Sequence, residues 1–142
     1  QSAMKEELIT FETAKLAKEK GFDIYCEWSY WEGSLTHGVP GYPLALENDK
    51  HSDYDRYLSF PRHLAPTQSL LQKWLREVHN IQLCLQPIYG GNKVDGKQIG
   101  WLCYTPFQDE DFNKLPSISL SQYTYEEALE KGLQEALKLF KL

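Results

Sequence analysis

The stretch APTQSLLQKWLREVHNI, from Ala65 to Ile81, carries the clearest structural pattern of the chain. Its apolar residues recur at the spacing that gathers side chains on one side of an α-helix. Pro66 suits the first helical turn, where a missing N–H costs nothing, and Asn80 is a good helix terminator. The members of the apolar stripe are Leu70, Leu71, Trp74, Leu75 and Val78. We predict a helix whose stripe forms part of the core.

A DNA-reading role is the main alternative for this helix. A recognition helix presents polar and basic side chains to base edges and needs further cations around it for the phosphates. Here the helix offers Lys73 and Arg76, set beside Glu77, in a chain with a formal net charge of −5. A strand pattern follows Asn80, so no second helix is joined to it by a short turn. The sequence therefore argues against nucleic acid as the partner.

Two further helices are predicted from their end signals. Thr10 is placed to cap the first helix, and Gly21 can take the left-handed conformation that ends it. The last helix begins with a capping box from Thr124 to Glu127. Glycine inside a helix costs about 1 kcal/mol relative to alanine, so we interpret Gly132 as the site of close approach by a neighbouring element.

Alternating residues predict the strands. Over 23–31 the alternation separates an apolar face (Ile24, Cys26, Trp28, Tyr30) from a mixed aromatic face (Tyr25, Glu27, Ser29, Trp31). Two more strands are expected over 81–87, ended by Pro87, and over 98–106, with a turn at Asp95-Gly96. Together these patterns predict an α+β fold in the order α-β-(β)-α-β-β-α. A small antiparallel sheet carries about three helices packed mainly on one face.

The chain of 142 residues suits a single domain over 4–142. Gln1-Ser2-Ala3 before Met4 has the form of a tag remnant. Residues 32–64 form a long irregular insertion rich in Gly, Pro, Asp and His, in which we expect one or two short strands. The apolar runs are far shorter than a membrane span, so no membrane partner is expected.

The three cysteines predict free thiols and a reducing compartment. Cys26, Cys84 and Cys103 cannot all pair within one chain, and none belongs to a C-x-x-C motif. Each lies in an apolar, strand-like segment, where a thiol behaves as a small buried hydrophobe. We therefore expect a cytoplasmic protein.

No sequence motif identifies a cofactor or a catalytic residue. Residues 91–97 have the glycine and lysine spacing of a phosphate-binding loop, but Gln98 replaces the required Ser or Thr and a strand follows instead of a helix. His51, Asp53 and Asp55 are weak metal-ligand candidates, since their spacing in a loop does not make them converge. No nucleophile lies in an elbow motif. We predict no cofactor and no metal.

Aromatic residues make up 13% of the chain and provide the remaining functional signal. An aromatic sheet face beside a long loop is a reasonable binding site for a protein or a small ligand. The candidate binding residues are Tyr25, Trp31, Tyr42, Tyr54 and Tyr57.

Three blocks of sequence also resemble a known group of proteins. These blocks are ITFETAKLAKEKGFD (9–23), APTQSLLQKWLREVHNI (65–81) and YTYEEALEKGLQEALKL (123–139). They resemble small proteins encoded by bacteriophages and prophages of gut bacteria, Bacteroides-like hosts in particular. The resemblance implies a cytoplasmic protein associated with a mobile element, and it implies no activity, cofactor or site residue.

The resulting hypothesis is a non-enzymatic, phage-associated binding or accessory domain. It would act on a protein or small ligand through the aromatic sheet face and the 32–64 loop. Two alternatives stay open: a nucleic-acid-binding protein, and a small hydrolase or nucleotide-handling enzyme. Measuring affinity at increasing salt concentration separates the nucleic-acid alternative from the other readings, because phosphate contacts make affinity fall steeply with salt.

Overall fold

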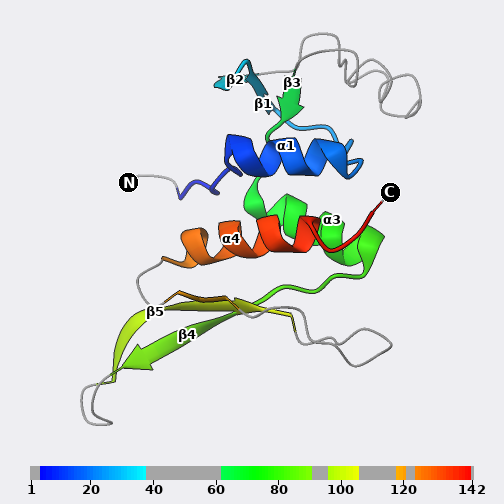
Figure 1. Cartoon of the computed structure of the whole chain (residues 1–142). Helices are drawn as coiled ribbons and strands as arrows, with labels where there is room; N and C mark the ends of the chain where they lie inside the picture. Colours follow the sequence, from blue (N-terminus) through cyan, green and yellow to red (C-terminus); the bar gives the residue numbers. More distant parts are fainter. Residues whose placement is uncertain (1–3, 38–61, 91–95, 106–117, 121–123, 142) are drawn as a thin grey trace. The chain divides into compact units, whose positions relative to one another are not determined.

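The computed structural model describes residues 4–37, 62–90, 96–105, 118–120 and 124–141 and has the predicted α+β fold and element order (Figure 1). The helices are α1 (Phe11–Glu19), α3 (Gln68–His79) and α4 (Tyr125–Leu137). The strands are β1 (Trp28–Trp31), β2 (Ser34–His37), β3 (Arg62–Leu64), β4 (Cys84–Gly90), β5 (Lys97–Tyr104) and β6 (Ile118–Leu120). They form two antiparallel sheets, ordered β2-β1-β3 and β4-β5-β6.

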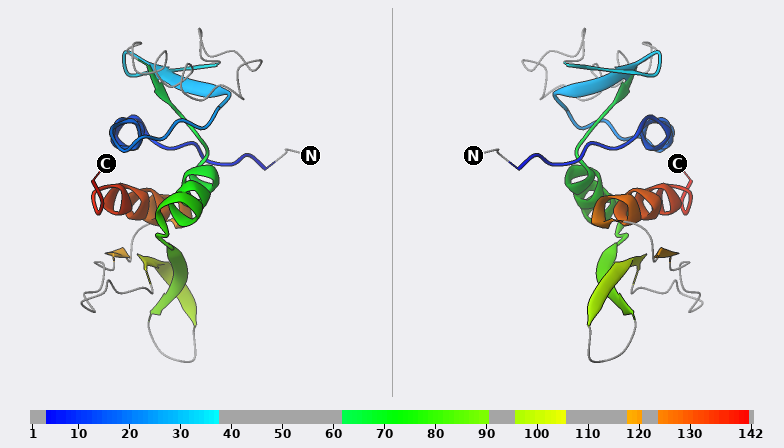
Figure 2. Two further views of the ribbon diagram at one scale, coloured as in Figure 1. Left: turned by 90° about the vertical axis from the view of Figure 1, so that its right-hand side faces the viewer. Right: turned by 90° about the vertical axis from the view of Figure 1, so that its left-hand side faces the viewer.

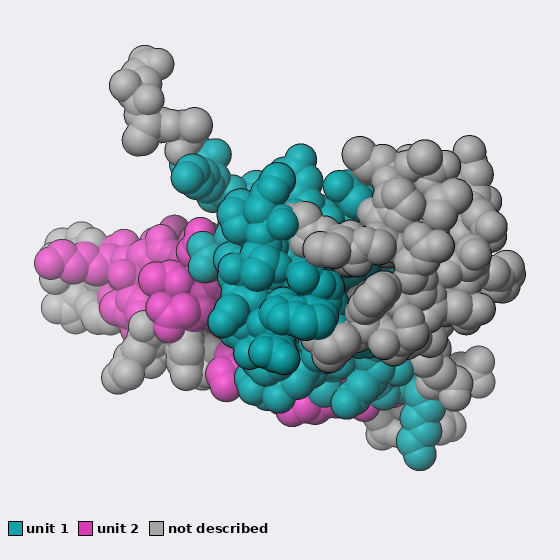
Figure 3. Space-filling view, turned by 90° about the horizontal axis from the view of Figure 1, so that it is seen from above, with its two compact units in different colours: residues 1–69, 140–142 teal, residues 70–139 magenta. Residues whose placement is uncertain are grey.

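The chain divides into two compact units, which Figure 3 shows in different colours. Unit 1 comprises Gln1–Ser69 with Phe140–Leu142, and unit 2 comprises Leu70–Leu139. One domain can contain such units, so the single domain over 4–142 stays a prediction. No helix within the described ranges is both long and apolar enough to cross a membrane.

In unit 1, α1 packs against one face of the β2-β1-β3 sheet (Figures 1 and 2). The Phe11 ring contacts the rings of Tyr30 and His63, with centroids 5.5 and 5.4 Å apart. Thr10 caps the helix as predicted, since its hydroxyl accepts the amide of Thr13, and Gly21 has φ +89°. Both ends of α1 are therefore defined by the residues that the sequence indicated.

The strand predicted over 23–31 is shorter than expected, because β1 begins only at Trp28. Within β1 the alternation holds, but the burial differs from the prediction. Trp28, expected on the apolar face, is 36% exposed, whereas Ser29 on the mixed face is fully buried. The short strands expected within 32–64 are confirmed as β2 and β3, both paired with β1.

Helix α3 is shorter than the predicted 65–81 helix and buries most of its stripe. Leu71, Trp74 and Leu75 are buried, and Leu70 is half-buried. Val78 is 60% exposed, so its assignment to the core was wrong. It lies in the last turn, just before Asn80 ends the helix with φ +56°, as predicted. The stripe is confirmed as core except at this end.

Pro66 does not occupy the first turn of α3. It precedes the helix and is fully buried, and its carbonyl accepts the amide of Ile9 at 3.0 Å. The amide of Gln68 donates to the Glu7 carbonyl at 2.8 Å. A proline without an N–H fits here because the pairing with Glu7 and Ile9 uses the Pro66 carbonyl and the amide of Gln68, the first residue of α3.

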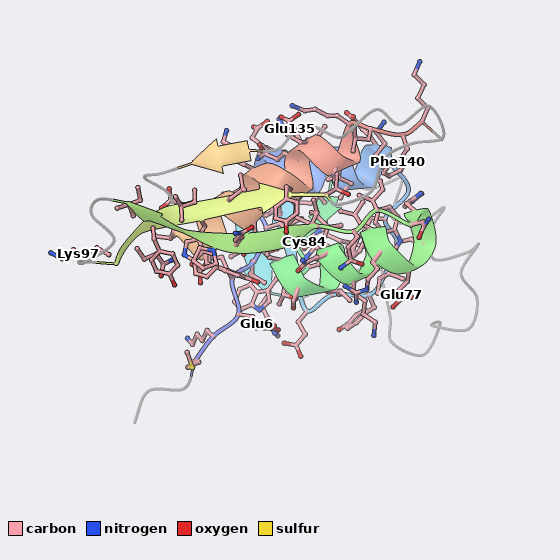
Figure 4. All side chains as sticks on the ribbon, turned by 90° about the horizontal axis from the view of Figure 1, so that it is seen from below. Glu6, Glu77, Cys84, Lys97, Glu135 and Phe140 are labelled. Atoms are coloured by element: carbon pink, nitrogen blue, oxygen red, sulfur yellow. The ribbon has the colours of Figure 1, made fainter. Side chains whose placement is uncertain are left out.

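In unit 2, helices α3 and α4 lie on the same side of the β4-β5-β6 sheet (Figures 1 and 2). Strands β4 and β5 form the predicted hairpin, in which Gly90 pairs with Lys97, and Figure 4 places Lys97 at its end. The prediction that Pro87 ends the ladder was wrong, since Pro87 pairs with Trp101 and β4 continues to Gly90. Because β4 is an edge strand, a residue lacking an N–H is tolerated there.

A register shift near the end of this hairpin changes the exposure of β5. It occurs between Ile88 and Tyr89, opposite Gly100 and Gln98, and leaves Ile99 as the extra residue. Ile99 is 47% exposed, whereas Cys103 further along the strand is buried. A bulge of this kind interrupts the alternation of side chains.

Helix α4 begins at the predicted capping box, where the Thr124 hydroxyl accepts the Glu127 amide at 3.2 Å. The interpretation of Gly132 as a point of close approach is confirmed. A Cβ added there would overlap the sulfur of Cys103 and touch Leu83. The absence of a side chain therefore lets α4 lie directly on the sheet of unit 2.

Candidate functional site

The predicted binding residues have different outcomes in the structure. Trp31 is the last residue of β1 and is half-buried. Tyr25 precedes β1, so it does not share a strand face with Trp31 as predicted, although it makes contacts of its own. The other predicted residues, including the metal candidates, lie outside the described residues: Tyr42, Tyr54, Tyr57, His51, Asp53 and Asp55.

Cross-strand register identifies what surrounds Trp31. Trp31 pairs with Ser34 of β2 and with Arg62 of β3, and Ser29 pairs with Thr36 and Leu64. Directly paired residues of antiparallel strands share a sheet face, so these residues lie together. We call this the Arg62 face: Ser29, Trp31, Ser34, Thr36, Arg62 and Leu64. The opposite face carries Tyr30 and His63, which contact α1.

The Arg62 side chain crosses all three strands of this sheet. Its Nη1 atom donates to Ser29 Oγ at 3.2 Å and to Thr36 Oγ1 at 3.1 Å. Its guanidinium carbon lies 4.4 Å from the centre of the Trp31 ring, a cation–π arrangement. Thr36 Oγ1 also donates to the Ser29 carbonyl at 3.2 Å. Two hydroxyls and one indole thus fix the orientation of the guanidinium.

The guanidinium keeps unused donors among the described residues. An arginine carries five N–H groups, and the two hydroxyl contacts both use Nη1. Within the described ranges, Nε and Nη2 have no hydrogen-bond partner, and no carboxylate forms an ion pair with Arg62. Arg62 is half-buried rather than sealed from solvent. A positive charge held in this way attracts an anion.

Lysines of α1 act on β3, and Glu19 of the same helix partly offsets their effect on His63. Lys18 Nζ of α1 donates to the Arg62 carbonyl at 2.7 Å, and burial lowers the pKa of Lys18. The pKa of His63 is lowered mainly by burial and then by the charges of Lys18 and Lys15. Its Nδ1 atom is buried without a partner among the described residues. Neutral His63 therefore suits its position against the Phe11 ring.

The turn beside Trp31 is conformationally strained. Glu32 and Gly33 connect β1 to β2 and have φ values of +50° and +84°. A two-residue hairpin turn with both φ values positive is type I′, which favours Asn, Asp or Gly at its first position. Glutamate in this conformation costs free energy, and such outliers cluster at functional sites.

The sequence singles out Trp31 as a candidate, but it does not indicate Arg62, Ser29 and Thr36 as a group. Arg62 belongs to a stretch that lacks any periodic pattern, and 33 positions separate it from Ser29. Only the pairing of β3 with β1 brings the two together, and a single sequence does not reveal that pairing. A basic residue at the end of the insertion, beside a proline, was the one available signal.

Among the described residues, no three His, Cys, Asp or Glu side chains are grouped so as to hold a metal ion. No family model, curated protein or solved structure matches the chain. The phage and prophage resemblance stays a prediction.

Proposed function

We propose that the protein is a non-enzymatic binding domain that takes a protein or small ligand on the Arg62 face. The observation that carries this proposal is the half-buried guanidinium held by Ser29, Thr36 and Trp31, with no carboxylate partner among the described residues. Binding sites combine an aromatic surface with a few oriented polar groups, and this face has both.

The 32–64 segment supports the same proposal. It supplies β2 and β3, and hence Thr36 and Arg62, to the face. Long insertions in compact domains are usually functional. The strained Glu32 turn next to Trp31 adds a second mark of a functional region. Cytoplasmic location and phage association belong to the proposal as well, supported by the three free thiols and the sequence resemblance respectively.

A protein-observed NMR screen tests the proposal. Uniformly ¹⁵N-labelled protein is titrated with a library of small metabolites and short peptides. We expect the ligands that bind to shift amide signals of β1, β2 and β3. Trp31→Ala should abolish binding, because that indole forms part of the proposed contact surface.

Trp28→Ala is the matched control. Trp28 lies in the same strand as Trp31 but on the other face, where its ring contacts His37 with centroids 4.9 Å apart. Binding should survive this substitution. A library that leaves the β1–β3 signals unchanged, or ligands that bind Trp31→Ala as well as the wild type, would refute the proposal. A separate titration with a DNA oligonucleotide that binds, with an affinity that falls steeply with salt, would favour nucleic acid instead.

A further inference from the structure

We infer that the Arg62 face binds a carboxylate group of its ligand through the Nε–Nη2 edge of Arg62. The inference rests on the proposed function and deepens it by naming the ligand chemistry. A carboxylate is available from a small organic acid or from an acidic side chain or chain end of a protein. The two sources present the same two oxygen atoms to the site.

The geometry of the guanidinium selects which of its edges is available. Both hydrogen bonds to the hydroxyls of Ser29 and Thr36 leave from Nη1, so the two N–H groups of that atom are occupied. Nε and Nη2 together form a planar edge with two nearly parallel N–H groups. This edge matches the two oxygens of a carboxylate and allows a bidentate contact.

The arginine is oriented before any ligand arrives. Its guanidinium carbon lies over the Trp31 ring, and its Nη1 atom is hydrogen-bonded to residues of β1 and β2. An arginine on a free surface loses side-chain entropy when it binds, and this loss weakens most exposed ion pairs. Fixing the rotamer in advance removes that cost from the binding step.

Charge favours a carboxylate over a phosphate or a nucleic acid. The Arg62 face contains one cation and no acidic residue, which balances a single negative charge. Lys18, the nearest described cation on α1, already donates to the Arg62 backbone carbonyl. A phosphate carries up to two charges and is usually held by several cations or amide groups. A chain with net charge −5 also repels polyanions.

The test compares acids with their neutral amides. The probes are acetate with acetamide, and acetyl-Gly-Glu-Gly-amide with acetyl-Gly-Gln-Gly-amide, at pH 7 and constant ionic strength set with sodium chloride. The readouts are the ¹H–¹⁵N signals of Arg62 Nε and of the Trp31 indole. We expect both acids to shift these signals in a saturable way and both amides to leave them in place.

Three variants separate charge from geometry. Arg62→Gln removes the charge and should weaken acid binding by about 10- to 100-fold, the range for a lost charged hydrogen bond. Arg62→Lys keeps the charge without the planar edge and should give an intermediate affinity. Arg76→Gln is the matched control, since Arg76 is an arginine of α3 whose side chain is 40% exposed and pairs with Glu77. It should bind the acids like the wild type.

The affinities of the two acids distinguish the source of the carboxylate, and the amides and Arg62→Gln test whether a carboxylate binds at all. A peptide acid that binds at least tenfold tighter than acetate supports a protein source for the carboxylate, and equal affinities support a small acid. Acids that bind no better than amides, or bind Arg62→Gln as well as wild type, overturn the carboxylate inference. If the amides nevertheless shift β1–β3 signals, the proposed function survives this failure. Should Arg62→Gln fail to fold, Arg62→Lys still tests the planar edge, and acid binding by Arg62→Lys as tight as by the wild type would overturn the bidentate contact.

Discussion

The two sheets of this protein use their side chains in opposite ways. In unit 2, a glycine of α4 and the buried thiol of Cys103 bring helix and strand into direct contact. In unit 1, the Arg62 face contains an arginine that is hydrogen-bonded to a serine and a threonine and lies over Trp31. Close apolar packing maximises burial, whereas oriented polar groups cost stability and are retained where they serve binding. On the function proposed above, the unit 1 sheet is the one that binds a ligand, and the unit 2 sheet is structural.

The largest effect that tests this comparison is expected at Trp74. Its side chain is 6% exposed in α3, so Trp74→Ala should lower the free energy of unfolding by about 3–5 kcal/mol through lost burial and a cavity. Val78→Ala, four residues along the same helix and 60% exposed, should change it by less than about 0.5 kcal/mol. Urea denaturation measures both. A Trp74→Ala variant with wild-type stability would show that the stripe is not core.

The next largest effect is expected in the reactivity of the three cysteine thiols. Burial raises the pKa of Cys26 to about 12, and burial followed by the nearby Cys84 raises that of Cys103 to about 11. At pH 8 their thiolate fractions should fall about 1,000- and 100-fold below those of ordinary cysteines, since each pKa step is tenfold. Half-buried Cys84 should therefore react first with a thiol reagent. Rapid labelling of all three, or a disulfide detected by mass spectrometry, would contradict the expected burial.

The same pKa shifts have a consequence for stability. A thiol with a raised pKa in the folded state stays neutral there while the unfolded chain ionises. The stability that the neutral Cys26 thiol contributes to the folded state is complete below the ordinary pKa of 9.0. It is lost as the pH rises towards the folded-state pKa of about 12. The free energy of unfolding should fall over this interval, and it should fall less in Cys26→Ala.

A smaller effect is expected at Gly132. Gly132→Ala adds a methyl group against Cys103, which should cost about 1–3 kcal/mol as overpacking, offset by about 1 kcal/mol of helix propensity. In a Cys103→Ala background the sulfur is gone, so the added methyl should cost less. A double-mutant cycle by urea denaturation measures this coupling. Simple additivity would show that α4 does not rest on Cys103.

The smallest effect is expected at the strained turn of unit 1. Glu32→Asn places a residue that tolerates positive φ at the first position of the β1–β2 turn and should stabilise the protein by about 0.5–1 kcal/mol. Thermal denaturation measures the gain. Glu27→Asn, at an exposed acidic residue just before β1, controls for the loss of charge. A destabilised Glu32→Asn variant would mean that the Glu32 side chain has a structural role.

The sequence predicts local structure better than it predicts the site. Helix ends are fixed by the side chain or backbone of a single residue. The four residues predicted to do this all behave as expected: Thr10, Gly21, Asn80 and Thr124. Burial at Val78 and the continuation of β4 through Pro87 depend on neighbours distant in the chain. The Arg62 face forms only because strands distant in the sequence pair, so no single residue in the sequence predicts it.

The four tryptophans provide the most direct test of where the ligand binds. Trp28 and Trp31 lie on opposite faces of the unit 1 sheet, Trp74 is in α3, and Trp101 contacts Tyr125 of α4 with ring centroids 5.0 Å apart. Each has one indole N–H signal, so a single ¹H–¹⁵N spectrum with the acidic peptide reports on all four places. The account predicts a saturable shift of the Trp31 signal and no shift of the Trp74 and Trp101 signals. A shift of Trp101 or Trp28 with Trp31 unmoved would contradict it.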